Sequence, residues 1–158
     1  MSIGRHPTRR KPIPILHRGR VLAGLAAAAF ALARPAAAAT IEVAVDGADP
    51  GTSVSVALCQ GGLSEEACNL GQEVPARGGP VNVVFRDVPA GRYAVAAFED
   101  VNGNGKLDRT GLGLPTEPYG FSGGAGLKAR PSFAQAAFEL REPGTALRVR
   151  LVRALPRR

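Results

Sequence analysis

The fold is decided by residues 81–98, VNVVFRDVPAGRYAVAAF, which hold two apolar segments joined by a turn. In residues 81–86 a large apolar side chain stands at every second position, from Val81 to Phe85. Successive side chains of a strand point to opposite faces, so this spacing predicts a strand with one buried face. Pro89 and Gly91 mark a turn. Residues 92–98 are apolar on both faces, which predicts a central strand.

The same alternation continues outward in both directions. It recurs in residues 41–46 and 53–58 before this segment, and in residues 134–140 and 147–151 after it. Turns that contain Gly and Pro separate these stretches. After residue 39 no stretch has the 3.6-residue apolar period of a helix. We therefore predict an all-β fold, a single antiparallel β-sandwich of six to seven strands that spans residues 40–158.

Residues 1–39 have the three parts of a secretory signal peptide. Residues 1–20 are basic, residues 21–33 are apolar, and the small residues from Ala36 to Ala39 offer a cleavage site. The apolar run is shorter than the roughly 20 residues of a membrane-spanning helix, which favours a cleaved leader over an anchor. We predict cleavage after Ala39 and an exported, periplasmic or extracellular protein with no transmembrane segment in its mature chain. Arg9-Arg10 leaves a twin-arginine export route open as an alternative.

The net positive charge of the chain comes from this leader. The chain carries 20 Lys and Arg against 13 Asp and Glu, a net charge of +7. Residues 1–39 hold seven of the basic residues and no acidic one, so residues 40–158 are formally neutral. The charge therefore predicts no nucleic-acid partner. Arg148 and Arg150 alternate with apolar residues, and we interpret them as the solvated face of the last strand.

Both histidines, His6 and His17, lie in the leader. Residues 40–158 therefore lack the imidazole that Ser-His-Asp and Cys-His systems need, and that His-ligated zinc, copper and haem sites need. The sequence predicts no catalytic residues. The alternative is a small hydrolase of envelope or extracellular glycans that would use two carboxylates. The candidates for that pair are Glu99, Asp100, Asp108 and Glu117.

Two cysteines, Cys59 and Cys68, lie in the predicted mature chain. In an exported protein, two cysteines nine positions apart predict one disulfide that closes the polar loop between them. Two free thiols are the alternative.

Residues 100–108, DVNGNGKLD, have the spacing of a calcium loop, with Gly105 at the position of the sharp turn. The candidate ligands are Asp100, Asn102, Asn104, the backbone carbonyl of Lys106, and Asp108. Gly111 stands where a bidentate carboxylate is usual, so Glu117 is the candidate further ligand. We predict a weak calcium site with a dissociation constant of about 10⁻⁴–10⁻³ M. The alternative is a metal-free turn that Asn and Gly favour for backbone reasons.

Residues 110–130 are rich in Gly and Pro and show no strand pattern. A loop of this length in a compact domain is usually functional or disordered. It carries Glu117, Tyr119 and Phe121, which we predict as a binding loop next to the calcium loop. The alternative is a covering loop in which Phe121 closes one end of the sandwich.

Four linked motifs resemble a family of exported bacterial proteins catalogued as domain of unknown function 2141. They are Pro89-Ala90-Gly91-Arg92-Tyr93-Ala94-Val95, the run from Phe98 through Asp108, the run from Gly113 through Ser122, and the run from Pro131 through Phe138. Pro118 stands where the family usually has Gly. The resemblance implies a transthyretin-like or immunoglobulin-like β-sandwich with no assigned activity and no catalytic residues to carry over. The Asp-x-Asn-x-Asn-Gly piece also occurs in unrelated surface-protein modules, where it is associated with calcium.

Together these observations predict an exported, non-enzymatic β-sandwich protein. It would be a binding or structural module of the cell envelope, with an unidentified envelope or extracellular partner. Calcium is the one cofactor that the sequence suggests.

Overall fold

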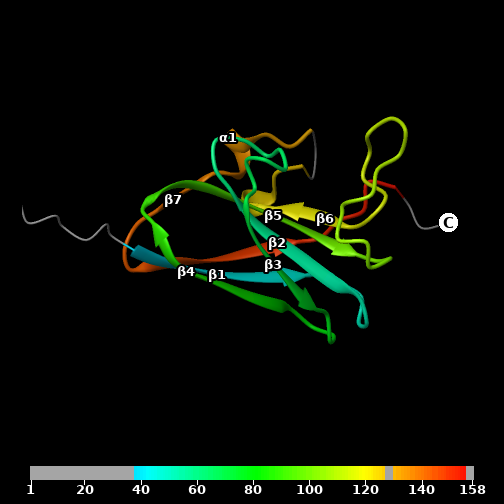
Figure 1. The fold of residues 1–158 in the computed structure, drawn as a ribbon, viewed down its shortest axis with the longest axis horizontal. Coiled ribbons are helices and arrows are strands. Elements are labelled where there is room, and N and C mark those ends of the chain that lie inside the picture. Colours follow the sequence, from blue (N-terminus) through cyan, green and yellow to red (C-terminus); the bar gives the residue numbers. More distant parts are fainter. Residues whose placement is uncertain (1–37, 127–129, 156–158) are drawn as a thin grey trace, which may run out of the picture. The chain divides into compact units, whose positions relative to one another are not determined.

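The computed structural model describes residues 38–126 and 130–155, and most of the predicted leader lies outside these ranges (Figure 1). The described part is built mainly of strands, arranged in two sheets. Eight strands are present in these ranges: β1 (Ala38–Asp46), β2 (Ser53–Cys59), β3 (Leu70–Pro75), β4 (Val81–Pro89), β5 (Gly91–Asp100), β6 (Tyr119–Phe121), β7 (Phe138–Leu140) and β8 (Gly144–Arg150). The expected six to seven strands were too few, because β3 and the three-residue strand β6 show no apolar alternation in the sequence.

The first sheet has the strand order β4-β1-β8. β1 pairs with β4 in the antiparallel sense, but it pairs with β8 in the parallel sense, from Thr40 opposite Gly144 to Asp46 opposite Arg150. The prediction of a wholly antiparallel sandwich was therefore wrong for this pair. Alternation sets which side chains are buried, and it holds no information on the direction of the neighbouring strand.

The second sheet has the order β3-β2-β5-β6, and β7 also pairs with β5. The sequence analysis missed β3. This strand lies at the sheet edge, and all its residues are exposed except Val74, which is half-buried. An edge strand with little buried surface has no apolar alternation to reveal it. Gln72 of β3 donates a side-chain hydrogen bond of 2.9 Å to the carbonyl of Val84 in β4.

The two sheets share one hydrophobic core, which is the arrangement of a β-sandwich. The first sheet contributes Ile41, Val43 and Phe85, and the second contributes Val56 and Val95, all at most 2% exposed. The alternating pattern in the sequence placed these side chains inward, and the structure confirms that placement.

A second, smaller cluster covers the opposite face of the second sheet. A 3-10 turn, η1 (Ser122–Gly124), and a one-turn helix, α1 (Phe133–Ala136), lie over β5. The prediction of one strand over residues 134–140 was wrong, because α1 occupies its first half and only β7 follows. Ala136 of α1 is buried in this cluster, and its carbonyl accepts a hydrogen bond of 2.6 Å from the Ser122 hydroxyl.

β1 begins two residues before the predicted domain start at Thr40. Ala39 is 1% exposed and pairs with Val88 of β4. Cleavage after Ala39 would therefore remove the first two residues of a core strand. Within residues 38–126 and 130–155, no helix has the length and apolar character needed to cross a membrane.

Candidate functional site

The loop after β5 is organised around the carboxylate of Asp100, the last residue of that strand. Asp100 Oδ2 accepts a hydrogen bond of 2.7 Å from the backbone N–H of Gly105. Its Oδ1 accepts bonds from the N–H groups of Gly103 at 2.7 Å and Asn104 at 3.1 Å. These bonds favour the charged form, and the Gly105 N–H contributes most to lowering the pKa of Asp100 below its ordinary value.

The side chains of Asn102, Asn104 and Asp108 meet on the exposed side of this loop. Asn102 Nδ2 donates to Asp108 at 2.7 Å, and Asn104 Nδ2 donates to both Asp108 oxygens at 3.1 and 3.2 Å. The amide oxygens serve the backbone instead, since Asn104 Oδ1 accepts from the N–H of Lys106 at 2.8 Å. Four of the predicted ligand side chains, those of Asp100, Asn102, Asn104 and Asp108, therefore make hydrogen bonds within this loop. Lys106 is exposed to solvent.

Glu117 lies beneath the loop and joins its two ends. Its Oε1 accepts the N–H of Val101 at 2.9 Å, and its Oε2 accepts the N–H of Asp108 at 3.1 Å. The residue is 6% exposed, so both bonds form largely away from water. Glu117 was predicted as a further metal ligand or a binding-loop residue, and the structure places it as a clamp on the backbone of residues 101–108.

Glu99 is a buried acid at the end of the sandwich core. It is 0% exposed, and its side chain continues the inward-facing series of Val95 and Ala97 on β5. Glu99 Oε1 accepts bonds from the backbone N–H of Asp49 at 3.0 Å and from the Thr52 hydroxyl at 3.1 Å. Its Oε2 has no hydrogen bond but lies 3.8 Å from a guanidinium nitrogen of Arg153. Asp100 points to the other face of the strand, as alternation requires.

The predicted disulfide is confirmed: Cys59 and Cys68 are joined with an S–S distance of 2.04 Å. Cys59 ends β2, so the bridge ties the loop of residues 60–67 to the second sheet. The bridged cysteines belong to the smaller apolar cluster, together with Leu63 of the same loop.

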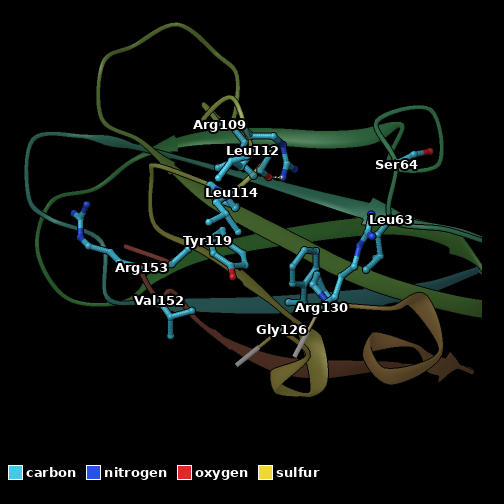
Figure 2. Close-up of a pocket in the computed structure, with 16 residues that line it drawn as sticks. Leu63, Ser64, Arg109, Leu112, Leu114, Tyr119, Gly126, Arg130, Val152 and Arg153 are labelled. Carbon is cyan, nitrogen blue, oxygen red and sulfur yellow. Dashed lines mark hydrogen bonds between the residues drawn. The ribbon is translucent and has the colours of Figure 1, made fainter. Parts of the chain in front are cut away.

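An open groove of about 980 Å³ lies between this disulfide loop, residues 107–115 and the chain after β8. Tyr119 and Phe121 of β6 line it, with ring centroids 6.0 Å apart in an edge-to-face arrangement. Figure 2 shows Tyr119 between Leu114 on one side and Val152 on the other. The predicted binding-loop aromatics therefore line a groove from a short strand, whereas the sequence suggested an irregular loop.

The loop between β5 and β6 forms one wall of the groove and projects beyond both strands, in yellow-green in Figure 1. Its outer part is closed by a hydrogen bond of 2.8 Å from the N–H of Thr110 to the carbonyl of Leu114, and by a bridge between Arg109 and Pro115. Two leucines at this turn are exposed, Leu112 at 90% and Leu114 at 46%. Exposed large apolar residues next to a groove are typical of a binding surface.

The oxygen donors of the 100–108 loop fit a hard cation such as calcium better than a transition metal. Carboxylates of Asp100 and Asp108 and the amides of Asn102 and Asn104 are the side-chain donors. No group of three or more His, Cys, Asp or Glu side chains comes together as a metal site anywhere in the described part of the chain. A calcium ion here would therefore depend on amide, backbone and water oxygens in addition to the two acids.

A family model described as an uncharacterized protein conserved in bacteria, DUF2141, matches residues 43–148. The chain belongs to this family. The match runs from β1 to β8, so it includes both sheets, the 100–108 loop and the residues of β6. Searches of curated proteins and of solved structures found no match.

Sequence reasoning missed three features of this site. The clamp role of Glu117 and the pairing of Arg153 with Glu99 depend on contacts between residues far apart in the sequence. Ser122 also gave no signal in the sequence, although the residue is 2% exposed and its hydroxyl accepts a hydrogen bond of 2.9 Å from the N–H of Val95. On this side of β5, β7 pairs with residues 91–93 and β6 pairs with residues 96–98, so Val95 lies between the two paired stretches. Ser122 therefore bonds a strand N–H that neither short strand reaches.

Proposed function

We propose that this chain is an exported, non-catalytic binding module with an immunoglobulin-like or transthyretin-like β-sandwich. Its binding end is formed by residues 100–121, and its 100–108 loop takes up calcium weakly. The observation that carries the proposal is the hydrogen-bonded loop around Asp100, which adjoins the groove lined by Tyr119. Export is supported by the basic, apolar and small-residue pattern of residues 1–39.

The use made of the acidic side chains supports a binding role over hydrolysis. Glu99, Asp100 and Glu117 each accept backbone N–H groups, so they serve to hold loops in place. Glycoside hydrolysis needs two carboxyl groups that face each other across a cleft, about 5–9.5 Å apart. The described lining of the groove includes no Asp or Glu.

The calcium proposal rests on the donor set and on how the loop is built. Asp108, Asn102 and Asn104 meet at one exposed point, and Asp100 holds the turn through Gly105. A bound cation would neutralise the charge of Asp108 and stiffen the loop that forms one wall of the groove. With two acids in the loop, the affinity expected is in the range of extracellular modules, about 10⁻⁴–10⁻³ M.

The test is a thermal melt of the purified protein in 10 mM chelator and in about 10 mM calcium at matched ionic strength. A ligand that binds the native state stabilises it by RT ln(1 + [L]/Kd), about 1.4 kcal/mol for a site with a Kd of about 1 mM. The melting temperature should then rise by about 3–6 °C. Asp108→Asn is the informative variant, because its carboxylate accepts only from the Asn102 and Asn104 side chains and not from the backbone.

The matched control is Glu42→Gln, which changes an exposed acid of β1 far along the chain from the loop. We expect the control to keep the calcium shift and Asp108→Asn to lose most of it. Equal shifts in both variants, or no shift in the unmodified protein, would rule out calcium at this loop. Magnesium at the same concentration distinguishes a specific site from general screening of charge.

A further inference from the structure

The groove beside Tyr119 combines apolar walls with positive charge. Leu63, Leu112, Leu114, Phe121 and Val152 provide apolar surface, and its described lining includes three arginines and no acid. The arginines come from three separate segments: Arg109 follows the 100–108 loop, Arg130 precedes α1, and Arg153 follows β8. The formal charge of residues 40–158 is zero, so this groove is a local concentration of positive charge.

The three arginines are not equivalent. Arg153 lies 3.5 Å from Asp49 and 3.8 Å from Glu99, so its charge is already compensated. Arg109 donates from one guanidinium nitrogen to the carbonyl of Gly113 at 3.2 Å and keeps its remaining donors. Neither Arg109 nor Arg130 has an ion pair with an acid of the described ranges. Two guanidinium groups, each able to hold a carboxylate through a pair of parallel bonds, therefore line the groove.

β6, the strand that lines the groove, offers no open edge to a peptide. The N–H and the carbonyl of Tyr119 both bond to Val152, at 2.9 and 2.8 Å, while β6 pairs with β5 on its other side. Recognition by addition of a peptide strand needs an open row of backbone groups. An occupant of this groove therefore does not add a strand to β6, and the side chains that line the groove offer it apolar contact and guanidinium groups.

We propose that the groove binds a small amphipathic carboxylate, such as a medium-chain fatty acid. The apolar tail lies against Leu112, Leu114 and Tyr119, and the carboxylate is held by one of the two guanidinium groups without an ion pair, that of Arg109 or that of Arg130. The volume of about 980 Å³ is at the upper end of the range for small-molecule sites. This inference names the ligand of the proposed binding module, and so it rests on the proposed function.

The probe is sodium decanoate, titrated into the purified full chain by isothermal titration calorimetry. For a ligand of this size an open site gives a dissociation constant of about 0.1–1 mM. Decyltrimethylammonium has the same tail with the opposite charge, and acetate has the head group without the tail. We expect both to bind at least about tenfold more weakly than decanoate, because each lacks one half of the recognition.

The variant is the double substitution Arg109→Gln with Arg130→Gln, which leaves the Arg153 pair with Glu99 intact. It should weaken decanoate binding by about tenfold or more. Arg86→Gln with Arg141→Gln, which removes two exposed arginines outside the groove, should change it by less than about twofold. Leu112 is 90% exposed, so its side chain is not needed for folding. The single substitution Leu112→Ser should weaken the binding of decanoate but not the binding of acetate.

Three results would overturn the inference: no saturable binding of decanoate, equal binding of decyltrimethylammonium, or equal loss in the two arginine double variants. The melting temperature of every variant shows whether it is folded. The calcium melt is independent of this titration. A calcium shift without decanoate binding refutes the groove ligand and leaves the loop proposal standing, and the opposite result refutes the calcium proposal alone.

Discussion

Loss of the Glu117 carboxylate should destabilise the 100–108 loop. Its two carboxylate oxygens accept the N–H groups of Val101 and Asp108, at 2.9 and 3.1 Å, and so fix both ends of the loop to one point. Glu117→Ala removes both acceptors. Glu117→Gln keeps the shape of the side chain and one acceptor oxygen, but its NH₂ group faces an N–H that it cannot bond.

The magnitude follows from these two bonds. A hydrogen bond to a charged group contributes about 1.5–3 kcal/mol to stability. The freed N–H groups lie at the edge of an exposed loop and regain part of this from water, so we expect a total loss of about 2–4 kcal/mol for Glu117→Ala. Glu117→Gln should lose about half as much. For a domain of this size the alanine variant should melt roughly 8–15 °C lower.

Unfolding in urea, followed by circular dichroism, measures the free energy of each variant. Hydrogen exchange should show faster exchange at the amides of Val101 and Asp108 than in the unmodified protein. Glu139→Ala is the control, because Glu139 is an exposed acid on the short strand β7. Its free energy of unfolding should stay within about 0.5 kcal/mol of that of the unmodified protein. If the free energy of unfolding of Glu117→Ala were also within about 0.5 kcal/mol of that of the unmodified protein, the two hydrogen bonds of Glu117 would not stabilise the fold, and this prediction would be refuted.

Three further predictions concern single contacts. Gly120→Ala should destabilise the fold by about 1–3 kcal/mol in urea unfolding, because the added Cβ would lie 2.5 Å from the carbonyl oxygen of Arg150. An unchanged unfolding midpoint would mean that β6 and β8 do not pack this closely. Ser122→Ala should cost about 1–3 kcal/mol because it strips the buried N–H of Val95 of its acceptor, and Ser122→Thr, which keeps the hydroxyl, should recover part of the loss. The lowered pKa of Asp100 means that its contribution to stability is complete above its ordinary value of 3.8 and is lost as the pH falls through the lowered folded value. Acid titration should therefore narrow the stability gap between the unmodified protein and Asp100→Asn below about pH 3.8, and a constant gap would refute this linkage.

The strands that form the core could be predicted from the sequence because burial leaves a period-two pattern. Ile41, Val56 and Phe85 were placed inward by alternation alone, and all three are buried. The same reasoning failed for the first half of residues 134–140, where alanine is the only apolar side chain. Alanine favours a helical turn as readily as it fills a strand, and contact with Ser122 on η1 decides between the two.

The candidate site was predictable only in part, for a similar reason. The spacing of Asp100, Asn102 and Asn104 identified a tightly folded loop, because those residues act within a few positions of each other. The groove needed residues that are 40 or more positions apart, such as Leu63 and Val152, to come together in the fold. A local sequence pattern holds no information on contacts between residues this far apart in the chain.

The parallel pairing of β1 with β8 also decides how the module would bear a load. Seven residue pairs join the two strands, from Thr40 opposite Gly144 to Asp46 opposite Arg150. The chain enters β1 at one end of this ladder and leaves β8 at the other, so tension between those points acts along the strands. Its evenly spaced hydrogen bonds would then resist together in shear and would not open one after another. A module tethered at both ends would thus be stiff against stretching, whatever its groove carries.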